Sequence, residues 1–271
     1  MLRLLVIILT LSSQTSVANE IYIIQSGDNF DFDVVQDGSN NSVAAIDTTS
    51  VVQGDNLTLR VDQIGDNNVI QGNVDGANNT GDLRQESDDN FQRVSVVGAS
   101  NSVTVYQGRH SDGTHDGEED GDHEAYWTVT GSNNTVASYQ TDTNRASGGA
   151  GHHLANVVDG DYNTVTHTQK GKAGHDGFVD IEGDSNTVDL YQRGNGGQQW
   201  ADITLTGDGH TVDATQRGTM AHSFELDLTN GGGAYSVDSS QTTNNTTTSK
   251  TYSLTGICTN SGGCSVSVTQ N

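Results

Sequence analysis

The sequence predicts an all-β protein, a β-solenoid of stacked two-strand coils, and three observations favour this fold class. The chain has 271 residues, with 33 glycines and no proline. Turn residues, asparagines and glutamines recur at fixed offsets through most of its length. Between the turns, apolar and polar residues alternate with the period of a β-strand. A backbone paired in continuous β-ladders explains all three features.

The composition limits both the fold and the partners. Asp and Glu number 35 against 11 Lys and Arg, the net charge is -24, and 31% of residues are hydrophobic. So few apolar residues would favour disorder. The absence of proline argues against disorder, because disordered linkers are usually rich in proline and a fully paired backbone excludes it. The acidity argues against nucleic acid and anionic membranes as partners, since both would repel the chain.

The first eighteen residues predict a signal peptide. Arg3 precedes the apolar run 4–9, and the small residues Ser16 and Ala18 follow at the position of a cleavage site. The alternative is a transmembrane anchor, but the run is about half of the ~20 residues needed to cross a bilayer. We therefore expect a signal peptide at 1–18 and a single repeat domain at 19–271, secreted to the extracellular space or cell surface without membrane insertion.

The repeat unit is eleven residues long in the first half of the chain. Gly54, Gly65, Gly76, Ser87 and Gly98 follow one another at that interval, and four of them are followed three positions later by Asn. Glycine and asparagine both tolerate the left-handed backbone of a tight turn, so each Gly-x-x-Asn predicts a corner. Two units make a coil of about 22–24 residues. The predicted turn glycines are Gly65, Gly76, Gly98, Gly131, Gly160, Gly183 and Gly207.

A longer block continues the pattern from Gly98 onward. Val follows each corner glycine by five positions and Gln follows it by nine, as in Gly98, Val103 and Gln107. An aliphatic residue stands two positions before each of these glycines. Alternate corners enlarge into longer loops of variable length. These aliphatic residues are Val96, Val129, Val158, Ile181 and Leu205.

The recurring glutamines predict a ladder inside the solenoid. A buried amide without a partner costs about 1–3 kcal/mol, whereas amides stacked in register donate to and accept from one another. A surface role is the alternative, but surface residues would not keep a fixed offset. On the outer face, we expect acidic columns to be interrupted by neutral residues or compensated by counter-ions. The predicted ladder is Gln25, Gln36, Gln63, Gln85, Gln107, Gln140, Gln169, Gln192, Gln216, Gln241 and Gln270.

Two cysteines, Cys258 and Cys264, lie near the C-terminus. In an oxidising compartment, cysteines six positions apart favour a disulfide that closes a small loop, with free thiols as the alternative. Such a bond would clamp an enlarged corner in the last coil, where fraying is expected.

The loop from Gly108 to Ala125 concentrates acidic residues with His110, His115 and His123. Carboxylates in a flexible loop suit calcium, and histidines suit a transition metal. A solvated acidic loop is the simpler interpretation, and no cofactor is predicted. The candidate metal ligands are Asp112, Asp116, Glu118, Glu119, Asp120 and Asp122.

The other histidines and acids do not indicate catalysis. His152, His153, His175 and His222 fall in enlarged loops, so we expect them to face solvent. Solenoid glycosidases and lyases need carboxylates clustered on one strand face, but Asp and Glu here scatter over turns. No catalytic residue is predicted, and the chain is not expected to be an enzyme.

Several of these motifs resemble the curlin repeat, the unit of curli amyloid subunits. The resemblance rests on the run 25–29 with Gln36, on the run 63–68, and on the later Gly, Asn, Val and Gln blocks, and it extends from Ile21 to Gln270. One glutamine of the family pattern is aliphatic here from Val74 onward, which makes this a divergent member. The resemblance implies an extracellular amyloid-type fibre in biofilm or surface adhesion, with secretion through a dedicated outer-membrane channel. It also implies that the partners are further copies or related subunits.

A second function stays open on the sequence. A solenoid that does not polymerise, such as an adhesin or a virion fibre component, would bind a glycan or receptor through its enlarged loops. These loops interrupt the same alternate corner, so they would line up along one edge of the stack.

Overall fold

The computed structural model describes residues 20–21, 24–25, 31–43, 51–52, 55, 58–108, 122–141, 151–227, 235–243, 249–255 and 264–270. The predicted signal peptide and the acidic stretch 109–121 lie outside these residues. The described residues contain no helix, and their strands form two ten-stranded parallel sheets and one two-stranded sheet. No described segment is a helix long and apolar enough to cross a membrane.

The two large sheets face each other across the molecule. The first, called here the glutamine sheet, contains β3 (Asp31–Asp37), β6 (Thr58–Ile64), β8 (Thr80–Glu86), β10 (Ser102–Gln107), β12 (Thr135–Thr141), β14 (Thr164–Lys170), β16 (Thr187–Gly194), β18 (Thr211–Gly218), β20 (Tyr235–Thr243) and β22 (Cys264–Gln270). The second, called the opposite sheet, contains β1 (Glu20–Ile21), β4 (Ser42–Val43), β7 (Val69–Gln71), β9 (Phe91–Arg93), β11 (Glu124–Thr130), β13 (His153–Asp159), β15 (Asp176–Val179), β17 (Gln199–Trp200), β19 (His222–Glu225) and β21 (Lys250–Ser253). The strands β2 (Ile24–Gln25) and β5 (Val51–Val52) pair separately.

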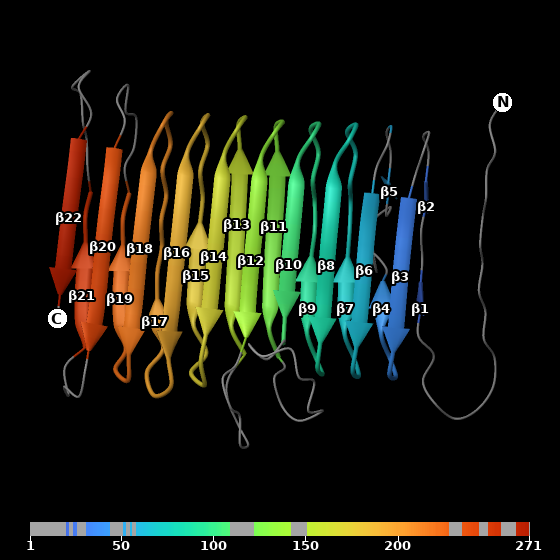
Figure 1. Cartoon of the computed structure of the whole chain (residues 1–271), viewed down its shortest axis with the longest axis horizontal. Coiled ribbons are helices and arrows are strands. Elements are labelled where there is room, and N and C mark those ends of the chain that lie inside the picture. Colours follow the sequence, from blue (N-terminus) through green and yellow to red (C-terminus); the bar gives the residue numbers. More distant parts are fainter. Residues whose placement is uncertain are drawn as a thin grey trace.

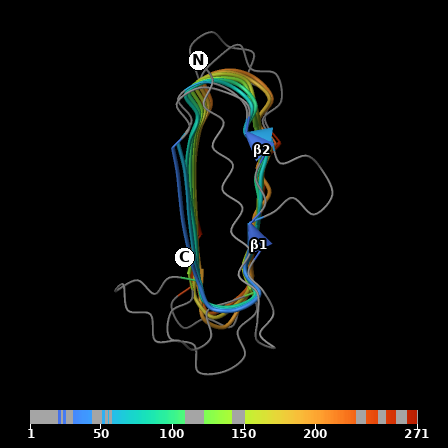
Figure 2. The same ribbon diagram turned by 90° about the vertical axis from the view of Figure 1, so that its right-hand side faces the viewer.

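The chain passes from one sheet to the other in every coil, so each coil adds one rung to both sheets (Figure 1). Seen along the stack, the coil is a flattened loop with two long sides and two rounded corners (Figure 2). The first corner leads from the glutamine sheet to the opposite sheet, and the second corner leads back. This arrangement confirms the predicted solenoid of stacked two-strand coils.

The rungs stay in register although the coils differ in length. Gln85 and Gln107 are 22 residues apart, whereas Gln107 and Gln140 are 33 apart because a long first corner lies between them. Both pairs are nevertheless direct partners across neighbouring strands. Extra residues therefore leave the ladder undisturbed, and the predicted length of about 22–24 residues holds only for coils with short corners.

The apolar core is a thin strip between the sheets. In the glutamine sheet, Val103, Val136 and Val165 occupy the same position in successive rungs and are buried. The predicted aliphatic residues that precede the second corner, such as Val129 and Ile181, are also buried. Burial of each such side chain contributes about 1.5–3 kcal/mol. Because the strip is thin, polar side chains fill both of its ends.

Candidate functional site

Ten glutamines form one continuous ladder along the glutamine sheet. Each side-chain Nε2 donates to the Oε1 of the next glutamine toward the C-terminus, at N to O distances of 2.6–3.0 Å. The ladder therefore has a direction, with acceptors toward one end of the molecule and donors toward the other. Its members are Gln36, Gln63, Gln85, Gln107, Gln140, Gln169, Gln192, Gln216, Gln241 and Gln270.

The same amides join the two sheets. Gln140 Nε2 also donates to the backbone oxygens of Glu124 and His152 in the opposite sheet, at 3.0 and 2.8 Å. Gln169 Nε2 repeats the pattern on the carbonyls of His153 and His175. Each glutamine thus satisfies its own amide and part of the opposite backbone, which makes the burial of so polar a group tolerable.

The prediction that Gln25 belongs to this ladder is wrong. Gln25 lies in β2 and pairs with Val52, outside the glutamine sheet. Val52 precedes Gly54 by two positions, as Val74 precedes Gly76. Gln25 therefore precedes a second corner, in the register of the aliphatic residues, and the ladder begins at Gln36.

A column of buried asparagines closes the second corner. The Oδ1 of Asn134 accepts the N–H of Asn163 in the next rung at 2.8 Å, and its Nδ2 donates to Gly160 O at 2.7 Å. The same pair of contacts continues from Asn163 to Asn186 and Gly183. The column comprises Asn79, Asn101, Asn134, Asn163 and Asn186.

The predicted reason for these asparagines is therefore wrong. The left-handed residue is the one before each asparagine, such as Asn133 and Ser185, with φ near 60°. The asparagine itself bridges two rungs, because the buried N–H and C=O groups of stacked corners need partners. A short amide side chain supplies one donor and one acceptor for this purpose.

The predicted turn glycines meet two different requirements. Five of them have positive φ, between 103° and 154°: Gly65, Gly131, Gly160, Gly183 and Gly207. Gly76 and Gly98 do not, but a Cβ on Gly98 would lie 1.6 Å from the carbonyl oxygen of Gly131. At those two corners, close stacking of backbone on backbone excludes any side chain.

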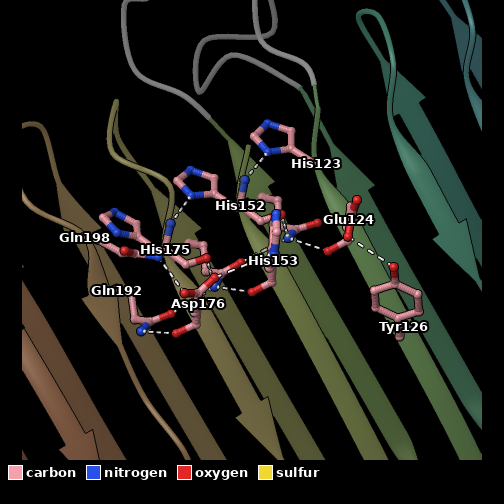
Figure 3. Close-up of polar contacts among 11 residues, drawn as sticks. His123, Glu124, Tyr126, His152, His153, His175, Asp176, Gln192 and Gln198 are labelled. Atoms are coloured by element: carbon pink, nitrogen blue, oxygen red, sulfur yellow. Dashed lines mark hydrogen bonds and ion pairs between the residues drawn. The ribbon is translucent and has the colours of Figure 1, made fainter. Parts of the chain in front are cut away.

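The first corner begins with asparagines and continues with histidines. Asn68 Oδ1 accepts the N–H of Asn90, in the manner of the second corner. Further along, His123 Nδ1 accepts the N–H of His152 at 3.0 Å, and His152 Nδ1 accepts the N–H of His175 at 3.1 Å. These rings stack on one another along the stack axis, with centroids 5.0 and 4.8 Å apart (Figure 3).

The expectation that His152, His153, His175 and His222 face solvent is wrong except at His153. His152 and His175 are fully buried and His222 is almost so, and His123 is fully buried as well. Each replaces an asparagine, with Nδ1 in the role of Oδ1. The sequence contains a signal for this, since His123, His152 and His175 directly precede strands of the opposite sheet, as Asn90 precedes β9, and His222 is the first residue of β19.

The longer ring fits a wider corner. Asn68 Nδ2 reaches the carbonyl of Ile64, four residues back, at 3.4 Å. His175 Nε2 reaches the carbonyl of Lys170, five residues back, at 3.0 Å. Because Nε2 donates and Nδ1 accepts, the ring must be neutral. Burial and the neighbouring His152 lower the pKa of His175 to about 3, and burial also lowers the pKa of His222.

The comparison with protein families agrees with this geometry. Residues 183–218 match the family model for the curlin associated repeat. The match includes two second corners, β16, β17 and β18, so it covers ladder glutamines Gln192 and Gln216. It confirms the resemblance to the curlin repeat. No curated protein and no solved structure matches the chain.

The predicted metal and disulfide residues fall largely outside the described part of the chain. Asp112, Asp116, Glu118, Glu119 and Asp120 lie in the stretch 109–121, and Asp122 is a left-handed corner residue. Among the described residues, no three His, Cys, Asp or Glu side chains are placed to hold a metal ion. Cys258 lies outside the described residues, and for Cys264 only the backbone, at the start of β22, is described.

The outer face of the glutamine sheet carries an acidic column, as expected, and a basic column that was not predicted. Asp189, Asp213 and Asp238 are direct neighbours in three successive rungs. Arg193 and Arg217, four residues further along β16 and β18, form a second uninterrupted column with Lys170 of β14. Neutral residues do not interrupt the acidic column across β16, β18 and β20, so of the two expectations only compensation by counter-ions stays open there.

Proposed function

We propose that this chain is a secreted structural subunit of a curli-like extracellular fibre, which grows by end-to-end stacking of its coils. The directional glutamine ladder is the observation that carries the proposal. It begins at Gln36, which donates inward to Gln63, and ends at Gln270, which accepts from Gln241. The amide of Gln270 and the Oε1 of Gln36 are complementary. A second chain placed head to tail would therefore continue the ladder with the same polarity.

The terminal strands support the same geometry. β3 and β22 are the outermost strands of the glutamine sheet. In this sheet the first N–H of a strand donates toward the C-terminal neighbour, as Thr164 does to Asn186 and Thr187 to His210. Outermost strands that offer backbone donors and acceptors invite the addition of another strand. A head-to-tail contact whose rotation does not close produces an open filament.

The family match and the predicted signal peptide support an extracellular location. Curlin repeats build structural proteins, and the buried polar groups of this chain are engaged in ladder bonds that hold the fold together. We propose that the partners are further copies or related subunits. Export through an outer-membrane channel and a role in biofilm or surface adhesion are parts of the same proposal.

Assembly of the purified mature chain, residues 19–271, tests the proposal. After removal of denaturant we expect unbranched fibres in electron micrographs and a meridional diffraction reflection at about 4.7–4.8 Å. A species that stays monodisperse for days would overturn the fibre. That result would favour a solenoid that binds a glycan or receptor through its enlarged loops.

A proline in the last strand separates end-to-end growth from nonspecific aggregation. Ser267 lies two positions after Ser265, the residue of β22 that is in register with Ser236 of β20 and Thr211 of β18, so its N–H points away from β20. Ser267→Pro removes an outward donor while the pairing of β22 with β20 remains, since proline is tolerated on an edge strand. We expect Ser267→Pro to slow fibre growth strongly and Ser267→Ala to leave it unchanged. Equal growth of the two variants would contradict stacking at this end.

A further inference from the structure

The acidic and basic columns on the glutamine sheet form two parallel stripes. The acidic column consists of Asp189, Asp213 and Asp238, and the basic column of Lys170, Arg193 and Arg217. On β16 and β18, the two strands that carry both charges, they are four residues apart, so the stripes are separated by about 13 Å. Asp189, Asp213, Asp238, Arg193 and Arg217 are exposed, and Lys170 is half-buried.

Within one chain, repulsion between the like charges of each column destabilises the fold. Like charges directly opposite one another on neighbouring strands are destabilising. Partial burial, with Asp213 as a further cause, raises the pKa of Asp189, as expected for a carboxylate beside another carboxylate. The basic column concentrates three of the chain's 11 Lys and Arg residues on adjacent rungs, in a molecule of net charge -24. Opposite charges on a binding partner would reduce the repulsion within both columns.

We propose that this face binds the same face of a second copy of the chain, related by a two-fold axis parallel to the stack. Such a rotation exchanges the stripes, so each acidic column faces a basic column. A two-fold axis parallel to the strands would instead place like charge on like. At equal height along the stack, Asp189 lies opposite Arg193 of the partner subunit, and Asp213 lies opposite Arg217 of the partner subunit.

The strip between the stripes suits the centre of such a contact. The column there contains Thr168, Tyr191 and Thr215 in successive rungs. The guanidinium carbon of Arg217 lies 4.6 Å from the centre of the Tyr191 ring, which holds the arginine against the sheet. Sheets that pack face to face are about 10 Å apart. Tyrosine at the centre with charges at the rim is a common composition of protein interfaces.

A single contact of this kind is small. Four rungs at about 4.8 Å and six residues at about 3.3 Å give roughly 400 Å² per chain, below the ~800 Å² of a stable pair. Within a fibre the contact would recur once per subunit, so many weak contacts would act together. In that setting the inference rests on the proposed fibre, and it predicts that fibres pair in parallel.

Charge exchange tests the pairing. Arg193→Glu with Arg217→Glu makes both stripes acidic, and Asp189→Arg with Asp213→Arg makes both stripes basic. We expect each double variant to form single fibres and to self-associate at least about tenfold more weakly than the unmodified chain. An equal mixture of the two variants, and the variant that carries all four changes, should pair again. Pairing of the unmodified chain should weaken in 1 M salt, where the Debye length falls to about 3 Å.

A matched control carries the same charge change on the other face. Arg93 is exposed on the opposite sheet, so Arg93→Glu should leave pairing unchanged while Arg193→Glu weakens it. Circular dichroism would verify that each variant folds. Fibre width in electron micrographs and sedimentation of the soluble chain at high concentration are the two readouts.

The outcomes distinguish the two proposals. If the chain forms no fibres but still forms charge-dependent dimers in sedimentation, only the fibre proposal is overturned. If fibres or soluble chains pair equally well in every charge variant, only the proposed lateral contact is overturned. Pairing that is lost in the variants but not restored by mixing also overturns it, and would indicate an anionic partner on the basic column instead.

Discussion

The early rungs β6 to β10 and the later rungs β11 to β19 share one coil but satisfy it differently. In the early rungs, asparagines such as Asn68 and Asn79 occupy both corners, and Arg60 lies between Asp33 and Asp82 on the outer face. In the later rungs the first corner is wide and contains histidine, and like charges stack in columns. The early rungs thus combine asparagine corners with paired opposite charges, whereas the later ones contain buried histidines and columns of like charge.

The coil tolerates this change because each corner requires a hydrogen-bond acceptor and a donor at given positions, and more than one residue type supplies them. Each corner needs an acceptor for the N–H of the next rung, which Asn68 Oδ1 and His152 Nδ1 both provide. A corner also needs a donor for a carbonyl of its own coil, at a distance set by the corner's width. Variation in the loops is therefore compatible with an unbroken ladder, provided that the bridging side chain changes with the width.

Acidification should have the largest effect and should separate the two regions. His167 is a fully buried residue of β14, and burial lowers its pKa to about 4. Burial with His152 lowers the pKa of His175 to about 3. Both rings are neutral when folded and titrate near 6.5 when unfolded. The stability they contribute is thus fully present above pH 6.5 and is lost as pH falls through 4 toward 3. At pH 5 the loss is about 2 kcal/mol per ring, or about 4 kcal/mol for both.

Hydrogen exchange at pH 7.5 and pH 5, corrected for intrinsic rates, measures this difference rung by rung. Protection in β13 to β16 should fall, while protection in β6 and β8 should change little. The variant His167→Gln with His175→Asn should flatten the pH dependence in the later rungs. Equal loss of protection in both regions would show that the histidines do not cause it.

The glutamine ladder should matter equally in both regions. Gln169→Leu removes the donor to Gln192 Oε1 and to the carbonyls of His153 and His175. Gln63→Leu removes the corresponding contacts to Gln85 and Asn68. Each should cost about 1–3 kcal/mol, because buried backbone acceptors lose their partners. Urea unfolding with the outward Thr168→Val as control tests this, and a cost confined to one region would contradict a uniform ladder.

Most of the fold could be predicted from the sequence, because period and offset are visible there. The spacing of Val103 and Gln107 from Gly98 determines the strand, its inward face and its register. The buried histidines could not, because an enlarged corner resembles a surface loop until neighbouring coils are stacked. The basic column was missed for a similar reason. Arg193 and Arg217 are 24 residues apart and become neighbours only when the coils are aligned.

Exchanging the bridging side chains should have a smaller effect. His175→Asn puts a short side chain in a wide corner, where it no longer reaches the carbonyl of Lys170. We expect a cost of about 1 kcal/mol for the lost hydrogen bond. The reverse change, Asn163→His, removes the Nδ2 donor to Gly183 O and should cost about 1–3 kcal/mol. Thermal unfolding of both variants measures the costs, and a neutral Asn163→His would contradict the need for this donor at the second corner.

The smallest effects should differ in sign between the two regions. Arg60→Gln in the early rungs removes the positive charge between Asp33 and Asp82, so we expect a loss of about 0.2–1 kcal/mol. Asp213→Asn in the later rungs removes the middle charge of the acidic column, so the isolated chain should gain a similar amount. Both changes should vanish in 1 M salt, where exposed charges are screened. Urea unfolding of the soluble chain at low and high salt measures them. A destabilising Asp213→Asn at low salt would mean that the acidic column is already compensated within the chain, and the electrostatic reason for a facing partner would be lost.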